Sequence, residues 1–219
     1  MIEIKNLLDT SKTIAKEIFE NKTYPFEVLP EIGEFILKLQ KTLDENEFNV
    51  LDGNVYIHKS VKVYETANIF GPCIIDEGTE VRPGAFIRGN AIIGKSCVVG
   101  NSTELKNVII FDNVQVPHYN YVGDSVLGFK SHMGAGSITS NVKSDKTLVK
   151  VKDGEKIIET GLKKMGAVLG DNVEVGCNSV LNPGTIVGRQ SNIYPLSCVR
   201  GTVPANSIFK AQGNIVEKY

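Results

Sequence analysis

The fold is decided by residues 57–105, which read IHKSVKVYETANIFGPCIIDEGTEVRPGAFIRGNAIIGKSCVVGNSTEL. Every sixth residue of this stretch is aliphatic: Ile57, Val63, Ile69, Ile75, Val81, Ile87, Ile93, Val99 and Leu105. The residues two places earlier are mostly small: Val61, Ala67, Cys73, Thr79, Ala85, Ala91, Cys97 and Thr103. An isolated strand cannot bury one aliphatic side chain per six residues. Three six-residue sides can bury it if they form a triangular coil and the coils stack about 4.8 Å apart. The repeat therefore predicts an all-β parallel β-helix whose interior holds both sets of side chains.

The repeat continues beyond Leu105 with two one-residue slips. It runs through Ile110, Val116, Val122, Leu127 and Met133, and it resumes at Leu169, Val175, Leu181, Val187, Ile193 and Val199. Turn-forming residues recur between the aliphatic positions: Gly71, Gly84, Gly94, Gly100, Asp112 and Asn113. We expect them at the corners, where unusual φ values are needed. A β-helix domain over residues 51–219 follows, with an excursion around 141–165.

The two segments outside the repeat have other patterns. Residues 1–50 show helical spacing, with one candidate helix around Ile14–Phe19 and a second that Pro30 opens. We expect this short α-helical segment to cap the open lower end of the prism, as terminal repeats often need. In the excursion, Asp153-Gly154 lies between apolar runs and predicts a hairpin.

Composition gives weaker constraints on function. The chain has 219 residues and a net charge of −1, so charge alone favours neither nucleic acid nor an acidic membrane as a partner. We find no apolar run of about 18 residues and no signal peptide, so we expect a cytoplasmic protein. Cysteines at 73, 97, 177 and 198 form no C-x-x-C pair, so we expect neither a metal site nor disulfides. Cys73 and Cys97 fit the small inward position.

The coil geometry brings a set of polar residues toward one region. The repeat positions 81, 99 and 116 share one side of the prism, and 105, 122 and 139 share the next. Arg82 and His118 then lie near one corner, about 10 Å apart. Around the following side lie Lys106, Tyr121 and Asn141, with Glu104 equivalent to Tyr121 one coil away. These groups suit a small phosphorylated substrate, because cations bind phosphate and an imidazole can act as a general base near neutral pH.

Four stretches carry a resemblance to a known family. They are Val81-Arg-Pro-Gly84, Gly100-Asn-Ser-Thr-Glu-Leu-Lys106, Val116-Pro-His-Tyr-Asn-Tyr-Val-Gly-Asp124 and Met133-Gly-Ala-Gly-Ser-Ile-Thr-Ser-Asn141. Together they resemble the acetyltransferase half of bifunctional glucosamine-1-phosphate acetyltransferase/N-acetylglucosamine-1-phosphate uridylyltransferase. The hairpin and Thr160–Ala167 are more similar to the archaeal sugar-phosphate nucleotidylyltransferase/acetyltransferase branch. The resemblance implies a left-handed hexapeptide-repeat β-helix, a homotrimer, and CoA-dependent N-acetylation of an amino-sugar 1-phosphate such as glucosamine 1-phosphate.

The resemblance also implies roles for individual residues. His118 would be the general base, with Glu104 polarising it. Binding of the sugar phosphate would fall to Arg82, Lys106, Tyr121, Asn141, Lys146 and Lys150. The acetyl-CoA co-substrate would meet Ala135, Cys177, Pro195 and Lys210.

Two departures from the family leave alternatives open. Val142 replaces an aromatic residue and His132 replaces an asparagine, which puts the identity of the amino sugar in doubt. The alternatives are a non-catalytic sugar-phosphate or nucleotide-sugar binding protein and an O-acetyltransferase for another sugar. A metal enzyme on the same fold would need three converging histidines, and the spacing of His58, His118 and His132 does not favour it. Fifty residues before the repeat cannot hold a uridylyltransferase domain, so we expect acyl transfer alone.

Overall fold

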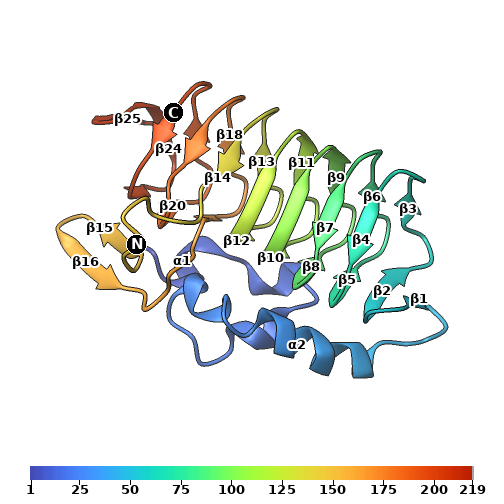
Figure 1. The fold of residues 1–219 in the computed structure, drawn as a ribbon. Coiled ribbons are helices and arrows are strands. Elements are labelled where there is room, and N and C mark those ends of the chain that lie inside the picture. The colour runs from blue at the N-terminus through green and yellow to red at the C-terminus, as the bar shows by residue number, and fades with distance from the viewer. Residues whose placement is uncertain (219) are drawn as a thin grey trace.

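The chain folds into a left-handed parallel β-helix, seen in a computed structural model that describes residues 1–218. Stacked parallel strands form the three sides of a triangular prism, and the coils advance from β2 and β3 at one end to β24 at the other (Figure 1). The predicted stacking is confirmed. Val81 pairs with Val99 and Val99 with Val116 on one side, while Leu105 pairs with Val122 on the next.

The strands of each side are short and nearly aligned. The first side contains β2 Val55–His58, β5 Cys73–Ile75, β8 Ala91–Ile93, β17 Ala167–Leu169, β20 Thr185–Val187 and β23 Thr202–Val203. The second contains β3 Lys62–Val63, β6 Glu80–Val81, β9 Val98–Asn101, β11 Gln115–His118, β13 His132–Met133, β18 Glu174–Val175, β21 Asn192–Ile193 and β24 Ser207–Ala211. The third contains β4 Asn68–Phe70, β7 Phe86–Arg88, β14 Ile138–Thr139, β19 Val180–Leu181 and β22 Cys198–Val199. Two longer strands, β10 Glu104–Ile110 and β12 Tyr121–Leu127, turn the corner between the third and first sides.

The interior of the prism is packed as the repeat predicts. The large residues Ile75, Val81, Ile87 and Leu105 are fully buried, and so is the small residue Ala85. The first coil is less enclosed, because Val63 is 41% exposed. Ile57 of the same coil is buried, so the opening is confined to part of the first coil.

A residue in the left-handed conformation marks most corners. Positive φ recurs at Asn90, Ser96, Ser102, Asn107, Asn113, Tyr119, Asp124 and Lys130. The expectation of unusual φ is confirmed for Gly84 and Asn113, but it is wrong for Gly71, Gly94, Gly100 and Asp112, whose φ is not positive. The three glycines are required by space. A Cβ at Gly100 would lie 1.6 Å from the carbonyl oxygen of Pro117 on the next coil.

The first of the two expected helices does not form. Its residues make two short 3₁₀ turns, η1 Thr10–Lys12 and η2 Lys16–Phe19, separated by the extended residue Thr13. The reason is local competition for backbone donors: Asp9 accepts from the Ser11 N–H and Thr13 Oγ1 accepts from the Ala15 N–H. The second helix is confirmed as α2 Ile32–Leu39. The remaining elements are α1 Ile4–Leu7, η3 Pro25–Val28 and η4 Gln40–Thr42.

The N-terminal segment covers a side of the prism and does not cap its end. The outward residues of the first side are apolar and fully buried: Ile74, Ile92, Ile109, Val126, Val168 and Ile186. α2 packs against β8 and β10, and η3 packs against β12 (Figure 1). The segment runs opposite to the coils, because Leu7 O accepts from Asp171 N whereas Gln40 donates to Asn54 O. The expected end cap is therefore wrong. The division at residue 50 stays a prediction, and both parts share one hydrophobic core.

The excursion contains the predicted hairpin. β15 Lys150–Asp153 pairs antiparallel with β16 Lys156–Glu159 around Gly154. Val149 and Val151 are fully buried, and β15 contacts β23, so the hairpin lies against the C-terminal coils. Two further antiparallel strands flank the prism, with β1 Phe48–Leu51 on β2 and β25 Asn214–Glu217 on β24. Within residues 1–218, no helix is long and apolar enough to cross a membrane.

We expect Gly100→Ala to lower the free energy of unfolding by about 2–4 kcal/mol, because the added Cβ overlaps the backbone of Pro117. Gly53→Ala is the matched control. Gly53 has a φ of 74° and open space around it, so the change costs only the left-handed conformation, about 1 kcal/mol. Urea unfolding of both variants measures the difference. Equal losses would show that coil-to-coil contact does not require glycine at position 100.

Candidate functional site

Asp124 is the centre of a polar cluster at the corner between the third and first sides. Its side chain is 5% exposed and accepts from Lys106 Nζ at 3.0 Å. It also accepts from Asn107 Nδ2 at 3.0 Å and from Asn141 Nδ2 at 2.5 Å. A buried carboxylate needs such partners, since an unpaired charge would be strongly destabilising. The cluster therefore fixes the positions of Lys106 and Asn141.

The backbone explains why these residues meet. Asn107 and Asp124 occupy the same corner on successive coils, and both have left-handed φ, 55° and 48°. Asn141 is the last residue before the excursion, and the returning chain closes the loop where Met165 N donates to Asn141 O. The cluster thus lies at the base of the excursion. Asn107 also donates to Leu29 O, which ties the cluster to the N-terminal segment.

Tyr121 joins the cluster through its hydroxyl group. Asn141 Nδ2 donates to Tyr121 Oη at 3.2 Å. The ring folds over Gly123, where a Cβ would lie 2.5 Å from the hydroxyl oxygen. Burial raises the pKa of Tyr121, and the charges of Asp124 and Glu104 raise it further. The phenol therefore stays protonated and its O–H is free to donate.

Glu104 is held by a residue that the sequence did not single out. It lies one coil from Tyr121, as predicted, but its carboxylate pairs with Arg88 Nη1 at 2.6 Å. Arg88 precedes Glu104 by 16 residues on the neighbouring coil of the same side. The structure does not bring Glu104 to His118, so the expected polarising contact is not formed in this chain.

Arg82 lies on a different side of the prism from Lys106. Its guanidinium pairs at 3.1 Å with Glu80 of β6, two residues earlier in the chain. The register Val81–Val99–Val116 aligns Arg82 with Gly100 and Pro117, one residue before His118. Arg82 is thus two coils from His118, as expected, but the structure does not bring it to the Lys106 cluster.

His118 begins a column of residues along the corner between the second and third sides. Its backbone oxygen accepts from Gly136 N, Ala135 O accepts from Asn178 N, and Cys177 O accepts from Leu196 N. His118, Ala135, Cys177 and Pro195 therefore occupy equivalent positions, one per coil. β24 adds Lys210 beyond Pro195, opposite Tyr194. The His118 side chain is exposed, and the structure gives its ring no hydrogen bond within residues 1–218.

His118 and Asp124 mark the two edges of one exposed face. They are six residues apart along β11 and β12, which is roughly 15–20 Å in an extended chain. One edge offers a basic imidazole, and the other offers an ammonium group with amide and phenol donors. A small ligand touching both edges would leave its outer surface uncovered by this chain.

Within residues 1–218, neither excursion lysine has a side-chain hydrogen bond or ion pair to the Asp124 cluster. Lys146 is exposed, and Lys150 pairs with Glu159 across the hairpin at 2.7 Å. A Cβ at Gly184 would lie 2.7 Å from Lys150 O, and Gly184 is two coils beyond Asp124. The structure therefore does not bring Lys150 to Lys106.

The remaining histidines and cysteines have structural surroundings. His132 Nδ1 contacts Glu174 Oε2 at 2.8 Å, and His58 Nδ1 contacts Ser60 Oγ at 2.8 Å. All four cysteines are free. Burial raises the pKa of Cys73 and of Cys97 to about 12, whereas Cys177 and Cys198 are exposed. Across the described chain, no group of three His, Cys, Asp or Glu residues is arranged to hold a metal ion.

The sequence alone did not assign roles to Asp124, Asn107 and Arg88. Asp124 lies inside one of the stretches that carry the family resemblance. The sequence signal for its contact with Asn107 is their spacing of 17 residues, which is one coil with one six-residue side shortened to five. Arg88 and Glu104 show a related signal. Opposite charges one coil apart on one side are neighbours in space.

Comparisons with known proteins agree with the recognised stretches. A family model described as the GMPPB C-terminal domain matches residues 69–191, more than half of the chain. The bifunctional sugar-1-phosphate nucleotidylyltransferase/acetyltransferase of Sulfurisphaera tokodaii is 33% identical over 186 residues, which cover 77% of this chain and 46% of that protein. The bifunctional protein GlmU of Methanocaldococcus jannaschii is 36% identical over 193 residues, 77% of this chain and 47% of that protein.

GlmU of Methanococcus vannielii is 34% identical over 222 residues, which cover 98% of this chain and 53% of that protein. The chain thus spans about half the length of these relatives. With more than half of its residues matched by the family model, this chain belongs to the family described as the GMPPB C-terminal domain, and it resembles the C-terminal acetyltransferase part of GlmU.

Proposed function

We propose that this protein is a CoA-dependent N-acetyltransferase that acts on an amino-sugar 1-phosphate such as glucosamine 1-phosphate. The observation that carries the proposal is the corner column that begins at His118 and continues through Ala135, Cys177 and Pro195 toward Lys210. An extended pantetheine arm running along this column would present its thioester beside His118. Lys210 would then meet a phosphate of the nucleotide.

The proposed reaction uses His118 as the base. The imidazole takes a proton from the sugar amine while the amine nitrogen attacks the thioester carbonyl carbon. The C–N bond forms, the C–S bond breaks, and the CoA thiolate leaves and takes up the proton. His118 is exposed and its ring has no hydrogen bond in the described chain, so both ring nitrogens are accessible to substrate.

The Asp124 cluster supports a sugar-phosphate subsite. Lys106 offers an ammonium group, Asn141 an amide and Tyr121 a phenol, all fixed within one cluster. The two edges of the face are far apart in one chain and open on the outside. We propose that a second copy of the chain covers them, within a homotrimer, and that Arg82, Lys146 and Lys150 contribute across that contact. A cytoplasmic location is part of the same proposal.

We expect His118→Ala to abolish acetyl transfer while leaving the fold unchanged, because the exposed side chain makes no contact that the fold needs. His58→Ala is the matched control and should keep wild-type turnover, since this histidine is partly exposed on the first side of the prism, away from the proposed site, and its ring contacts Ser60. A thiol-release assay with acetyl-CoA and glucosamine 1-phosphate measures turnover, and circular dichroism checks the fold. Wild-type turnover in His118→Ala would remove the proposed base.

Acetyl-CoA should protect Cys177 from alkylation and leave Cys198 unprotected. Both thiols are exposed, but only Cys177 lies on the proposed cofactor column, whereas Cys198 lies on the third side near Asn182. Cys73 and Cys97 should stay unmodified in the folded protein, because burial raises their pKa values to about 12. Mass spectrometry after iodoacetamide treatment measures the four sites separately. Equal protection of Cys177 and Cys198 would contradict the assigned path of the cofactor.

We expect Asp124→Asn to raise the KM for the sugar phosphate about tenfold, with a smaller change in kcat, because Lys106 loses the partner that positions it. The KM for acetyl-CoA should not change. Glu65→Gln, an exposed carboxylate away from the cluster, is the control. Steady-state kinetics with each substrate varied in turn tests this split. An equal rise in both KM values would indicate general disruption.

A second candidate function is binding of a sugar phosphate or nucleotide sugar without catalysis. One observation favours it: the charges of Arg82 and Lys106 are already paired with Glu80 and Asp124. Calorimetric titration with acetyl-CoA separates the two functions. Absence of binding at millimolar acetyl-CoA would favour the binding protein over the enzyme.

A further inference from the structure

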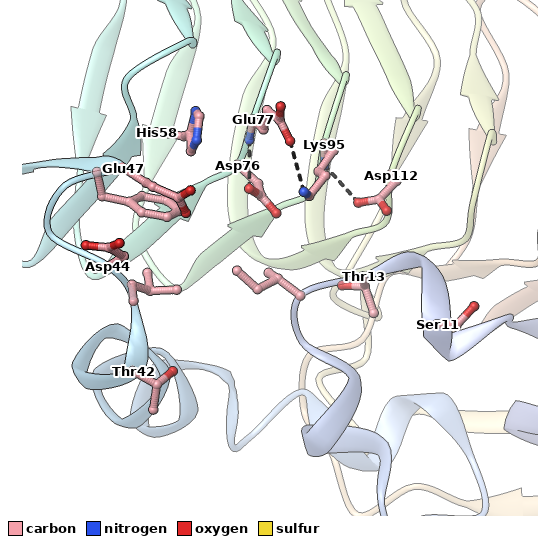
Figure 2. A pocket seen from close by; sticks show the side chains of 13 residues that line it. Ser11, Thr13, Thr42, Asp44, Glu47, His58, Asp76, Glu77, Lys95 and Asp112 are labelled. Carbon is pink, nitrogen blue, oxygen red and sulfur yellow. Dashed lines mark hydrogen bonds and ion pairs between the residues drawn. The ribbon is translucent and has the colours of Figure 1, made fainter.

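A pocket lies between the N-terminal segment and the β-helix, at the corner between the first and second sides. It encloses about 520 Å³. Figure 2 shows Asp76, Lys95 and Asp112 projecting from the β-helix, while Thr13 and Asp44 line the opposite wall from the N-terminal segment. This corner is neither the His118 corner nor the Asp124 corner, so the pocket is separate from the proposed catalytic site.

The pocket is strongly acidic. Five carboxylates line it: Asp44, Glu47, Asp76, Glu77 and Asp112. The basic side chains in the lining are Lys95 and His58. Lys95 Nζ is held by Glu77 at 2.9 Å, and His58 contacts Ser60. The lining therefore has an excess of negative charge that its own cations do not balance.

Asp76 makes this excess costly. It is only 3% exposed, and its Oδ1 accepts from the Glu77 N–H at 2.7 Å. Its Oδ2 is buried and has no hydrogen-bond partner among residues 1–218. A buried carboxylate oxygen without a donor is destabilising, so a positively charged donor in the pocket would be bound favourably. Burial also raises the pKa of Asp112, and the nearby Asp76 raises it further while the Lys95 N–H opposes the shift.

The apolar part of the pocket lining indicates which kind of cation would bind. Ile14, Leu43 and Phe48 give it an apolar surface. As noted above, the described residues offer no set of three ligands for a metal ion. An ammonium group on an alkyl chain satisfies both conditions, because the chain packs on the apolar wall while the charge meets Asp76.

We propose that this pocket binds a linear aliphatic diamine or polyamine, with one ammonium group donating to Asp76 Oδ2. A second ammonium group would meet Asp44 or Glu47 on the loop that joins η4 to β1. The ligand would then bridge the N-terminal segment and the β-helix. This inference does not rest on the proposed acetyltransferase activity.

Isothermal titration calorimetry of the full chain with 1,4-diaminobutane and with spermidine tests the proposal. We expect both to bind the wild type, and Asp76→Asn to weaken binding at least about tenfold, since the amide removes the charge and keeps the shape. Asp44→Asn, at an exposed position of the opposite wall, should weaken binding less. Glu65→Gln, outside the pocket, should leave binding unchanged.

Three results would overturn the proposal. The first is no heat of binding with either amine at millimolar concentration. The second is equal affinity in Asp76→Asn and Glu65→Gln. The third is binding of Mg²⁺ that depends on Asp76 while the amines do not bind, which would assign the pocket to a metal ion. Circular dichroism confirms that each variant is folded. If Asp76→Asn unfolds, the double variant Asp44→Asn/Glu47→Gln keeps the test decisive, because wild-type affinity in it would contradict the second ammonium contact.

Discussion

The structure depends on one constraint, the backbone hydrogen bonding of each coil to the next. These bonds fix the coil spacing, and they force residues 16 to 18 positions apart into columns on the surface. Gly100 shows how tight the constraint is, because any side chain there would overlap Pro117 on the next coil. The candidate functional residues of this protein are therefore arranged in columns along the corners of the prism. His118, Ala135, Cys177 and Pro195 share one corner, and Asn107 and Asp124 share another.

The sequence predicted the prism well, because the interior is one repeated interaction. Every inward position from Ile75 to Leu105 is buried, and both slips, before Ile110 and before Leu127, appear in the observed register. Placement of the N-terminal segment was not predicted. Its signal was present in the runs Cys73-Ile74-Ile75 and Ala91-Ile92-Ile93, where three consecutive apolar residues mark a side that is buried on both faces. Similar runs occur on the other sides, at Ala85-Phe86-Ile87 and Cys97-Val98-Val99, but their outward residues Phe86 and Val98 are only half-buried.

The candidate site was predicted in part, and the failures have a physical cause. Register places residues on a side and a coil, so the grouping of Lys106, Tyr121 and Asn141 could be inferred. It does not decide which partner a long charged side chain takes. Glu104 was expected to contact His118 but pairs with Arg88, and Arg82 pairs with Glu80, two residues earlier in the chain. The slips mattered as well. Because one side of the coil has only five residues, Asn107 and Asp124 lie at the corner where the excursion leaves the prism.

The reversed path of the N-terminal segment has a consequence for how the molecule comes apart. Stacked repeats contact only their neighbours and can open one at a time from an end. Here, one short segment is bonded to coils along the prism, from Asp171 through Asp112 and Asn107 to Asn54. The Met1 amino group also pairs with Asp153 on the hairpin. Fraying of a terminal coil must therefore break contacts that also hold the middle of the array. Because this segment couples the coils, we expect the solenoid to unfold as a single cooperative unit.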